Sequence, residues 1–357
     1  MMEHSLRLLK ELTEAPGVPG HEVHVAKVIE ENLEGFAEVS RDKLGSVVAK
    51  KQGSTSSPKV MLAAHMDEVG MMVTSVTKEG VLRFIPLGGW WDQVMLAQRV
   101  SVKTARGDLP GVIGSKPPHI LPPDERKKVV EKKDMFIDIG AADEAEAKEL
   151  GVRPGDPVVP VSPFTPMAGG KVIMAKALDD RVGCALMIEA LQRLREREHP
   201  NTVYGVGTVQ EEVGLRGAKT SVSIVEPDVG IALEVAIAGD TPGIKEHEAQ
   251  SKLGGGPVIL LYDASMIPNL RLRDLAVEVA ESLDIPYQFD VMTGGATDAG
   301  HIHLYASGVP SIVLGVPTRY IHSHVGVLNM DDYRNTVKLL TELLARLDES
   351  TVRGLTD

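Results

Sequence analysis

The sequence contains little of several residue types, and each shortage argues against a class of protein. A single cysteine, Cys184, excludes an intramolecular disulfide and fits a reducing compartment. Aromatic residues make up only 4% of the chain, which argues against platforms on which bases or sugars stack. The chain carries 38 basic and 50 acidic residues, a net charge of −12. We therefore expect no nucleic-acid partner, because phosphate binding requires clustered lysine and arginine.

Long apolar runs are also missing. Charged residues lie throughout the first 14 positions, which excludes the apolar stretch of a signal peptide. No uninterrupted apolar run approaches the roughly 20 residues of a membrane span. We therefore expect a cytoplasmic protein without a membrane partner. Hydrophobic residues make up 43% of the 357 positions, enough to bury a large core.

Helix and strand patterns alternate in two separated parts of the chain. Helices are expected over 4–14 and about 23–33, followed by strands over 46–50 and 59–64. After Lys176 the alternation resumes, with helices expected at 180–197, 215–223, 268–283, 297–306 and 330–347, and strands at 202–209, 229–235, 257–262, 286–292 and 310–315. This order predicts an α/β fold with a mostly parallel sheet flanked by helices.

The residues between these parts have a different pattern. From Gly70 to about Gly170, short alternating runs lie between turn signals such as Glu79-Gly80 and Pro154-Gly155-Asp156, and only 143–150 is typical of a helix. The sequence predicts a discontinuous α/β domain over 1–69 and 171–357. A β-rich, PDZ-like or barrel-like domain over 70–170 is inserted into it.

Five short segments place metal-type ligands at or just beyond an expected strand end or helix start. They are residues 63–68 with His65 and Asp67, 177–181 with Asp179, 209–214 with Glu211 and Glu212, 231–235 with Glu234, and 319–324 with His322 and His324. Open α/β sheets carry their sites at the carboxyl ends of strands, so these segments are expected to meet there.

Each segment also has an interpretation without metal. The His65–Asp67 spacing places both side chains on one side of an extended chain, where a carboxylate can fix an imidazole tautomer; it also fits a buried structural pair. Asp179 opens a helix, where aspartate is an ordinary cap, yet its carboxylate can bridge two ions. Glu234 interrupts an apolar strand as a ligand or an ion-pair partner.

The adjacent acids allow two different roles. Successive side chains of a strand face opposite sides, so one of Glu211 and Glu212 can bind metal while the other faces a bound water. The alternative is that the strand has ended and both acids are solvated. Either His322 or His324 can ligate, and His324 is better suited to the surface or to a supporting contact.

The charges of these ligands favour two ions over one. Two divalent cations carry +4, three carboxylates supply −3, and one hydroxide brings the cluster to zero. A single ion would leave the acids in excess. Mixed imidazole and carboxylate ligands suit Zn²⁺ or a similar first-row ion.

Motifs in matched order along nearly the whole chain carry a resemblance to one family. They are AHMDEVG (64–70), GSKPPHILPPDERKK (114–128), ALDDRVG (177–183), QEEVGLRGA (210–218), LEVAIAGDTPG (233–243), GGATDAG (294–300) and RYIHSH (319–324). Together they resemble the tetrahedral aminopeptidases, the glutamyl or deblocking aminopeptidases among the di-metal peptidases.

The resemblance implies a role for each matching residue. Metal ligands would be His65 and Glu234 for one ion, Glu212 and His322 for the other, and Asp179 as the bridge between them. Glu211 matches the general base, and Asp67 matches the acid that supports the His65 site and catalysis. Relatives often carry aspartate at the position of Glu234.

The same resemblance implies a reaction and an assembly. A hydroxide bridging two Zn²⁺ or Co²⁺ ions, with Mn²⁺ possible, would attack the first peptide bond while Glu211 accepts its proton. Asp298 of GGATDAG is expected to contact the substrate or order the site wall. The inserted domain would form dimers, which assemble into a hollow tetrahedral dodecamer that admits peptides.

Three alternatives remain at this point. A glycoside hydrolase needs paired acids and aromatic platforms, and it gives His65 and His322 no task. Another di-metal amidohydrolase, such as a deacylase or a carboxypeptidase, would carry an α+β insertion in place of a β-rich one. A scaffold without activity would bind no metal.

Overall fold

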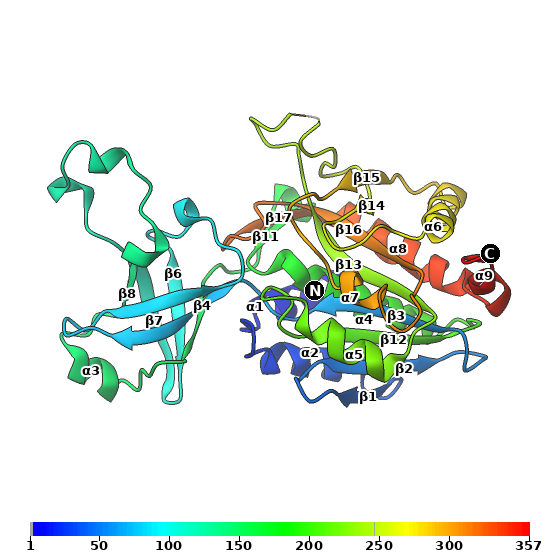
Figure 1. The fold of residues 1–357 in the computed structure, drawn as a ribbon, viewed down its shortest axis with the longest axis horizontal. Helices are drawn as coiled ribbons and strands as arrows, with labels where there is room; N and C mark the ends of the chain where they lie inside the picture. The colour runs from blue at the N-terminus through cyan, green and yellow to red at the C-terminus, as the bar shows by residue number, and fades with distance from the viewer. Residues whose placement is uncertain (1–2, 246) are drawn as a thin grey trace.

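Strands with hardly any polar residue form the centre of a large sheet. We describe a computed structural model of residues 3–245 and 247–357, in which this sheet and a separate small barrel lie side by side (Figure 1). In β3 (Lys59–His65) every residue after the first is buried, as expected for a strand covered on both faces. The strands of the sheet are arranged in the order β1-β2-β12-β3-β13-β16-β17-β11-β10. In addition, β14 pairs with β16, and β15 pairs with β14.

The four central strands are parallel, and the flanking strands pair antiparallel except for β15, which is parallel to β14. β12 (Thr202–Thr208), β3, β13 (Val229–Ile237) and β16 (Ser311–Arg319) pair in parallel. The remaining strands of this sheet are β1 (Glu38–Arg41), β2 (Val47–Gln52), β10 (Thr165–Met167), β11 (Val172–Ala175), β14 (Val258–Tyr262), β15 (Gln288–Val291) and β17 (Gly326–Asn329). The predicted α/β fold with a mostly parallel sheet is confirmed.

Helices cover both faces of the sheet. One face packs against α4 (Leu178–Leu194) and α8 (Met330–Arg346), with α1 (His4–Glu14) and α2 (Val23–Leu33) outside α4 and α6 (Leu270–Ser282) beside α8. The other face packs against α5 (Arg216–Val225) and α7 (Ala299–Ile302). A short helix α9 (Glu349–Gly354) follows α8. The main core lies on the α4 face, where Leu62 and Ala64 of β3 meet Val182 and Leu186.

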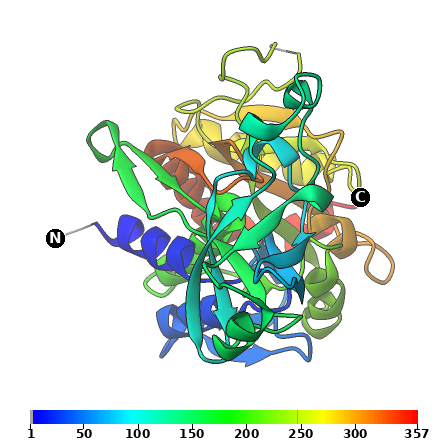
Figure 2. The same ribbon diagram turned by 90° about the vertical axis from the view of Figure 1, so that its left-hand side faces the viewer.

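The inserted segment closes into a barrel. Its strands are β4 (Gly70–Val76), β5 (Leu82–Leu87), β6 (Arg99–Thr104), β7 (Gly107–Gly114), β8 (Phe136–Asp138) and β9 (Pro157–Pro160), paired antiparallel around a core of their own. One helix, α3 (Glu144–Glu149), lies beside it. Seen from the barrel end, the barrel stands in front of the sheet and the β10–β11 hairpin projects to one side (Figure 2). The predicted β-rich insertion is thus a barrel, and its last strand ends at Pro160.

Several element boundaries differ from the sequence expectation, and two differ most. The helix expected over 297–306 is only the four-residue α7, and the turn that follows it contains Ala306 with a left-handed φ of 52° and Gly308 with a φ of 105°. The strand expected over 310–315 continues as β16 to Arg319, paired with β13 through Thr318. Across residues 3–245 and 247–357, no helix combines the length and the apolarity needed to span a membrane.

Candidate active site

The carboxyl ends of the parallel strands place the predicted ligands in one region. His65 is the last residue of β3, and Glu234 lies near the end of β13. Glu211 and Glu212 follow β12, and His322 follows β16, while Asp179 lies at the start of α4. All the predicted metal ligands therefore meet at one edge of the sheet, as expected for an open α/β fold.

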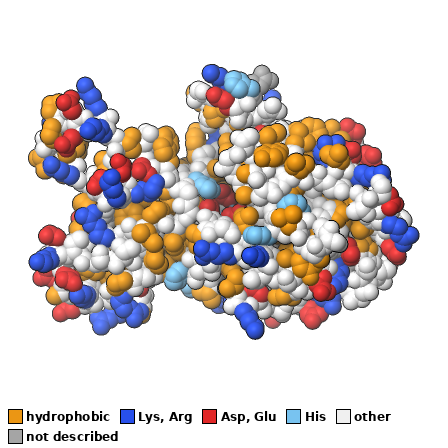
Figure 3. All heavy atoms as spheres, in the orientation of Figure 1, with side chains coloured by type: hydrophobic (Ala, Val, Ile, Leu, Met, Phe, Trp, Pro, Cys, Tyr) orange, Lys and Arg blue, Asp and Glu red, His pale blue; other side chains and the backbone are white. Residues whose placement is uncertain are grey.

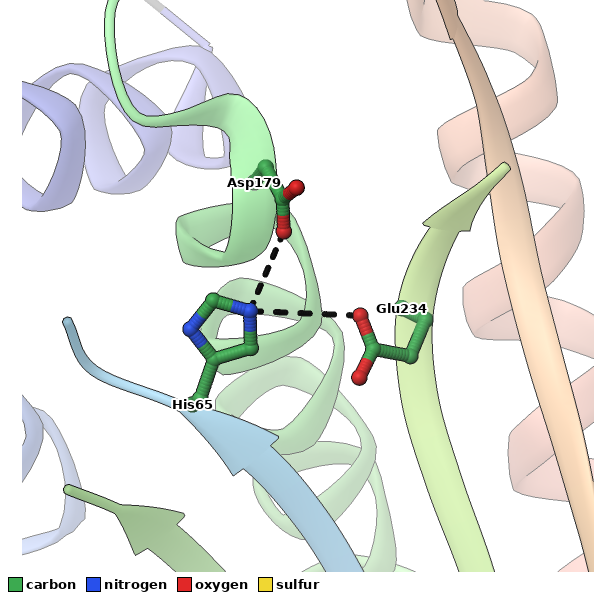
Figure 4. A group of neighbouring side chains, drawn as sticks. All are labelled: His65, Asp179 and Glu234. Atoms are coloured by element: carbon green, nitrogen blue, oxygen red, sulfur yellow. Dashed lines mark hydrogen bonds and ion pairs between the residues drawn. The ribbon is translucent and has the colours of Figure 1, made fainter. Parts of the chain in front are cut away.

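The first ligand group combines three buried or nearly buried side chains. His65 Nε2 lies 3.0 Å from Asp179 Oδ1 and 4.0 Å from Glu234 Oε2 (Figure 4). One donor atom of each residue lies within 4.8 Å of the others, a spacing that suits a single cation. The glutamate side chain at position 234 therefore reaches the group.

The second ligand group shares Asp179 with the first. His322 Nε2 lies 3.3 Å from Asp179 Oδ2 and 3.6 Å from Glu212 Oε2. The donor atoms of these three residues also lie within 4.8 Å of one another. Since Oδ1 of Asp179 faces His65 and Oδ2 faces His322, the carboxylate has the arrangement of a bridge between two cations.

Backbone carbonyls orient both imidazoles. His65 Nδ1 lies 3.0 Å from the carbonyl oxygen of Asp67, and His322 Nδ1 lies 2.8 Å from that of Gly89. A carbonyl only accepts, so each Nδ1 donates and each Nε2 is directed at its ligand group. The sequence suggested the Asp67 carboxylate as the partner of His65, but its Oδ1 lies 3.6 Å from Nδ1 and the carbonyl makes the bond.

Burial and mutual repulsion perturb the carboxyl groups in the absence of cations. Burial raises the pKa of Glu212 to about 7, and the charge of Asp179 adds to this. Burial also raises the pKa of Glu211 and that of Glu234 well above the usual range. For Asp179 the hydrogen bonds from His322 and His65 outweigh burial and hold the pKa below its ordinary value. Such a set of acids is stable in ionised form only beside positive charge.

The donor set fits divalent cations. Two imidazoles and three carboxylates supply the mixed nitrogen and oxygen ligands that zinc and similar ions prefer. In addition, Oε1 of Glu212 is buried and has no hydrogen-bond partner within residues 3–245 and 247–357. A buried carboxylate oxygen without a donor is costly, and a cation nearby would satisfy it.

Glu211 lies beside the first group and next to Glu212 in the chain, and it belongs to neither group. Its Oε2 is 3.8 Å from His65 Nε2, and its side chain is 10% exposed. Asp67, fully buried, accepts the backbone N–H of Glu211 at Oδ1 and that of Glu212 at Oδ2, both at 3.0 Å. The acid that sequence analysis placed in a supporting role thus holds the turn that carries the two glutamates.

The ligands line one wall of a cavity of about 670 Å³ between the sheet and the barrel. Its other walls include Gly89, Val235, Met292, Thr297 and Ile321. Figure 3 shows acidic side chains gathered in a hollow beside a histidine, between the two parts of the molecule. The cavity is open to solvent and large enough for the end of a peptide.

Two predicted residues lie away from this cavity wall. Asp298 is buried, its Oδ2 accepts the hydroxyl of Thr208 at the end of β12, and burial raises its pKa to about 6. His324 belongs to neither ligand group among the described residues, in line with the preference for His322.

Sequence analysis missed Gly88 and Gly89 of the inserted segment. A Cβ at Gly88 would lie 2.9 Å from Glu212 Oε2, and one at Gly89 would lie 3.0 Å from His322 Nδ1. The inserted segment therefore approaches the second ligand group through the backbone of two glycines, which have no side chain. The adjacent glycines before two tryptophans were the available signal, but nothing in the sequence links them to residues over 100 positions away.

Comparisons with known proteins agree with this site. The family model described as M42 glutamyl aminopeptidase matches residues 45–339, and a short model described as AMPT matches residues 3–28. The lysyl aminopeptidase of Pyrococcus furiosus is 38% identical over 347 residues, covering 95% of this chain and 96% of that protein.

Two solved structures are also similar to the whole chain. A TET aminopeptidase from a marine sediment archaeon of the Thaumarchaeota is 54% identical with a TM-score of 0.97, and covers 98% of each chain. The Pyrococcus horikoshii TET1 peptidase is 35% identical with a TM-score of 0.85, over 96% of this chain and 100% of that one. The chain therefore belongs to the M42 glutamyl aminopeptidase family and is a peptidase that acts at peptide N-termini.

Proposed function

We propose that this aminopeptidase depends on two divalent ions, Zn²⁺ or Co²⁺, with Mn²⁺ as a further candidate. His65, Asp179 and Glu234 would hold one ion, and Asp179, Glu212 and His322 the other. The observation that carries this proposal is the orientation of Asp179, whose two oxygens face two separate histidines. When bound, the ions would supply Lewis acidity toward a water molecule and the peptide carbonyl.

Glu211 would act as the general base and then as the general acid. Its carboxyl group lies beside His65 of the first ligand group and lines the cavity, so it can accept a proton from the attacking water. The same group can return that proton to the leaving amine. Asp67 supports this role through the backbone N–H groups of Glu211 and Glu212.

The acidic wall would also select the end of the peptide. An α-ammonium group is positively charged, and the cavity presents Glu211 and Glu248 outside the two ligand groups. The free N-terminus is thereby attracted to the wall, which places the first peptide bond beside Glu211. Asp298 would order this wall without lining the cavity, through the hydrogen bond that it accepts from Thr208.

The experiment that tests the proposal is the substitution Glu211→Gln. We expect turnover of an aminoacyl chromogenic substrate to fall about 10²–10⁴-fold, the usual contribution of a general base. Metal content, measured by mass spectrometry of the loaded protein, should stay at two ions per chain because Glu211 is outside both groups. A variant with near-normal turnover would contradict the base assignment, and a wild type active without metal would contradict the metal dependence.

We also propose the biological setting that the resemblance implied. The substrates would be peptides, the protein would act in the cytoplasm, and the barrel segment would form dimers within a tetrahedral dodecamer. The Pyrococcus horikoshii TET1 peptidase can assemble into a tetrahedron or a large octahedral shell, which supports an assembly of this kind.

A further inference from the structure

Three successive backbone N–H groups after β12 donate to carboxylate oxygens. The N–H of Gln210 donates to Oε1 of Glu22 at 3.0 Å. The next two, of Glu211 and Glu212, donate to the two oxygens of Asp67 at 3.0 Å each. The turn that carries the proposed base is therefore held by two acids: Asp67, which lies just after β3, and Glu22, which immediately precedes α2.

Glu22 is buried, and its side chain points away from its own helix. Only 5% of the residue is exposed, although it lies at the N-cap position immediately before α2. Glu22 occupies the N-cap position of α2, but its side chain makes no cap hydrogen bond to the first turn of this helix. Its Oε1 accepts the N–H of Gly20 at 2.8 Å and that of Gln210 at 3.0 Å. The carboxyl group thus connects the loop before α2 with the catalytic turn.

The residue that Glu22 holds has an unfavourable backbone conformation. Gln210 has a φ of 57°, in the left-handed region that side chains other than glycine seldom occupy. Such a conformation persists only where the surroundings enforce it. The contact with Glu22 fixes the N–H of this residue, immediately before Glu211.

We propose that Glu22 is a positioning residue that fixes the direction of the Glu211 side chain through the backbone of Gln210. This inference rests on the proposed role of Glu211 as the base. Loss of the contact would release Gln210 toward ordinary φ values and rotate the Glu211 carboxyl group. A substitution of Glu22 removes no side chain from the substrate cavity or from either ligand group.

An oxygen acceptor, more than a negative charge, is what this position requires. Burial, together with the charge of Asp67, raises the pKa of Glu22 to about 7, so the carboxyl group is partly neutral at neutral pH. Oε1 accepts both N–H groups in either state. Glutamine has the same length and keeps such an oxygen, whereas aspartate keeps the charge but is one methylene shorter.

The experiment compares Glu22→Ala, Glu22→Gln and Glu22→Asp in the metal-loaded full chain. We expect Glu22→Ala and Glu22→Asp to lower kcat about 10- to 100-fold, as small misplacements of catalytic groups do, with KM little changed. Glu22→Gln should stay within about threefold of wild type. Glu30→Ala is the matched control: it removes a glutamate from the same helix that pairs with Arg41 at 2.6 Å, far along the chain from Gln210.

Hydrogen exchange supplies a readout apart from activity. In metal-loaded protein the N–H of Gln210 should exchange at least about tenfold faster in Glu22→Ala and Glu22→Asp, and stay protected in Glu22→Gln. Normal kcat in Glu22→Ala, or loss in Glu22→Gln with retention in Glu22→Asp, would overturn the proposal. If Glu22→Ala does not fold, the comparison of the other two variants decides.

Glu211→Gln is assayed alongside to separate the two proposals. If it abolishes turnover while Glu22→Ala and Glu22→Asp are normal, only the positioning role is wrong. If Glu211→Gln itself retains turnover, the proposed base is wrong and the role of Glu22 falls with it.

Discussion

In the metal-free protein, single residues of this site have pKa values far from their ordinary values, and a bound cation would change them. Without metal, His322 gains protons easily: burial lowers its pKa, but the hydrogen bond to Asp179 and the charges of Glu212 and Asp179 raise it to about 9. Metal binding needs the neutral imidazole, so proton and cation compete for the same nitrogen. The metal-free and metal-loaded enzymes should therefore respond differently to pH.

We predict that His322 stabilises the metal-free protein at pH 7 and ceases to do so by about pH 9. The folded-state pKa of about 9 lies above the ordinary value of 6.5, so the stabilisation is complete below 6.5 and is lost as the pH rises through 9. The measurement is the difference in Tm between the wild type and His322→Gln, both metal-free. That difference should shrink from pH 7 to pH 9, and a constant or growing difference would contradict the prediction.

At the scale of elements, the strand ends position the ligands and short connecting segments adjust them. The loop after β5 passes so close to the second ligand group that only glycine fits. Gly88 has a φ of 86°, and an added Cβ would lie 2.8 Å from Val69 and 2.9 Å from Glu212 Oε2. This loop belongs to the barrel segment, so the insertion takes part in building the site.

Gly88→Ala should therefore weaken metal binding at the group of Asp179, Glu212 and His322. We expect the affinity for the second ion to fall at least about tenfold, because outer contacts commonly contribute that much. Titration of metal-free protein with Zn²⁺ against a competing chelator measures it. Gly140→Ala is the control, since Gly140 has a similar φ of 79° and open space around it. Equal affinities in the two variants would contradict a role of the contact with Glu212 in metal binding.

Elements that depend on local pattern were predictable, and contacts between distant segments were not. The apolar run of β3 ending in His65 indicates both a buried strand and its terminal ligand. The same holds for Glu234 within β13. By contrast, β17 is four residues long and runs directly into α8, so its pattern merges with that of the helix. The contact of Glu22 with Gln210 spans 188 positions, and no periodicity reports it.

The roles of adjacent acids show the same limit. From the residues alone, Glu211 and Glu212 were interchangeable, and the family resemblance was needed to distinguish them. The structure places Glu212 within the second group, whereas Glu211 lies outside both groups, close to His65. This difference arises from the turn after β12, where the Asp67 carboxylate and Glu22 hold three successive N–H groups.

At the scale of the whole molecule, the barrel presents a long exposed segment between β7 and β8. Ile120 is 65% exposed and Val129 is 51% exposed, both on this segment. Large apolar side chains exposed together on one segment are typical of surfaces that contact another protein. The segment lies within the insertion to which we assign dimer formation, and we propose that it forms a contact between copies.

We predict that the wild type sediments as a species with the mass of about twelve chains. The double substitution Ile120→Asp and Val129→Asp should convert it to smaller species in the same sedimentation-velocity experiment. Two carboxylates buried at such a contact would each need to be desolvated. The free-energy cost of this desolvation exceeds the stabilisation that the apolar contact provides. Activity on a dipeptide substrate should persist, because both positions are far along the chain from the ligands and leave the cavity intact. Unchanged mass in the double variant would place the contacts elsewhere, and a monomeric wild type would refute the assembly itself.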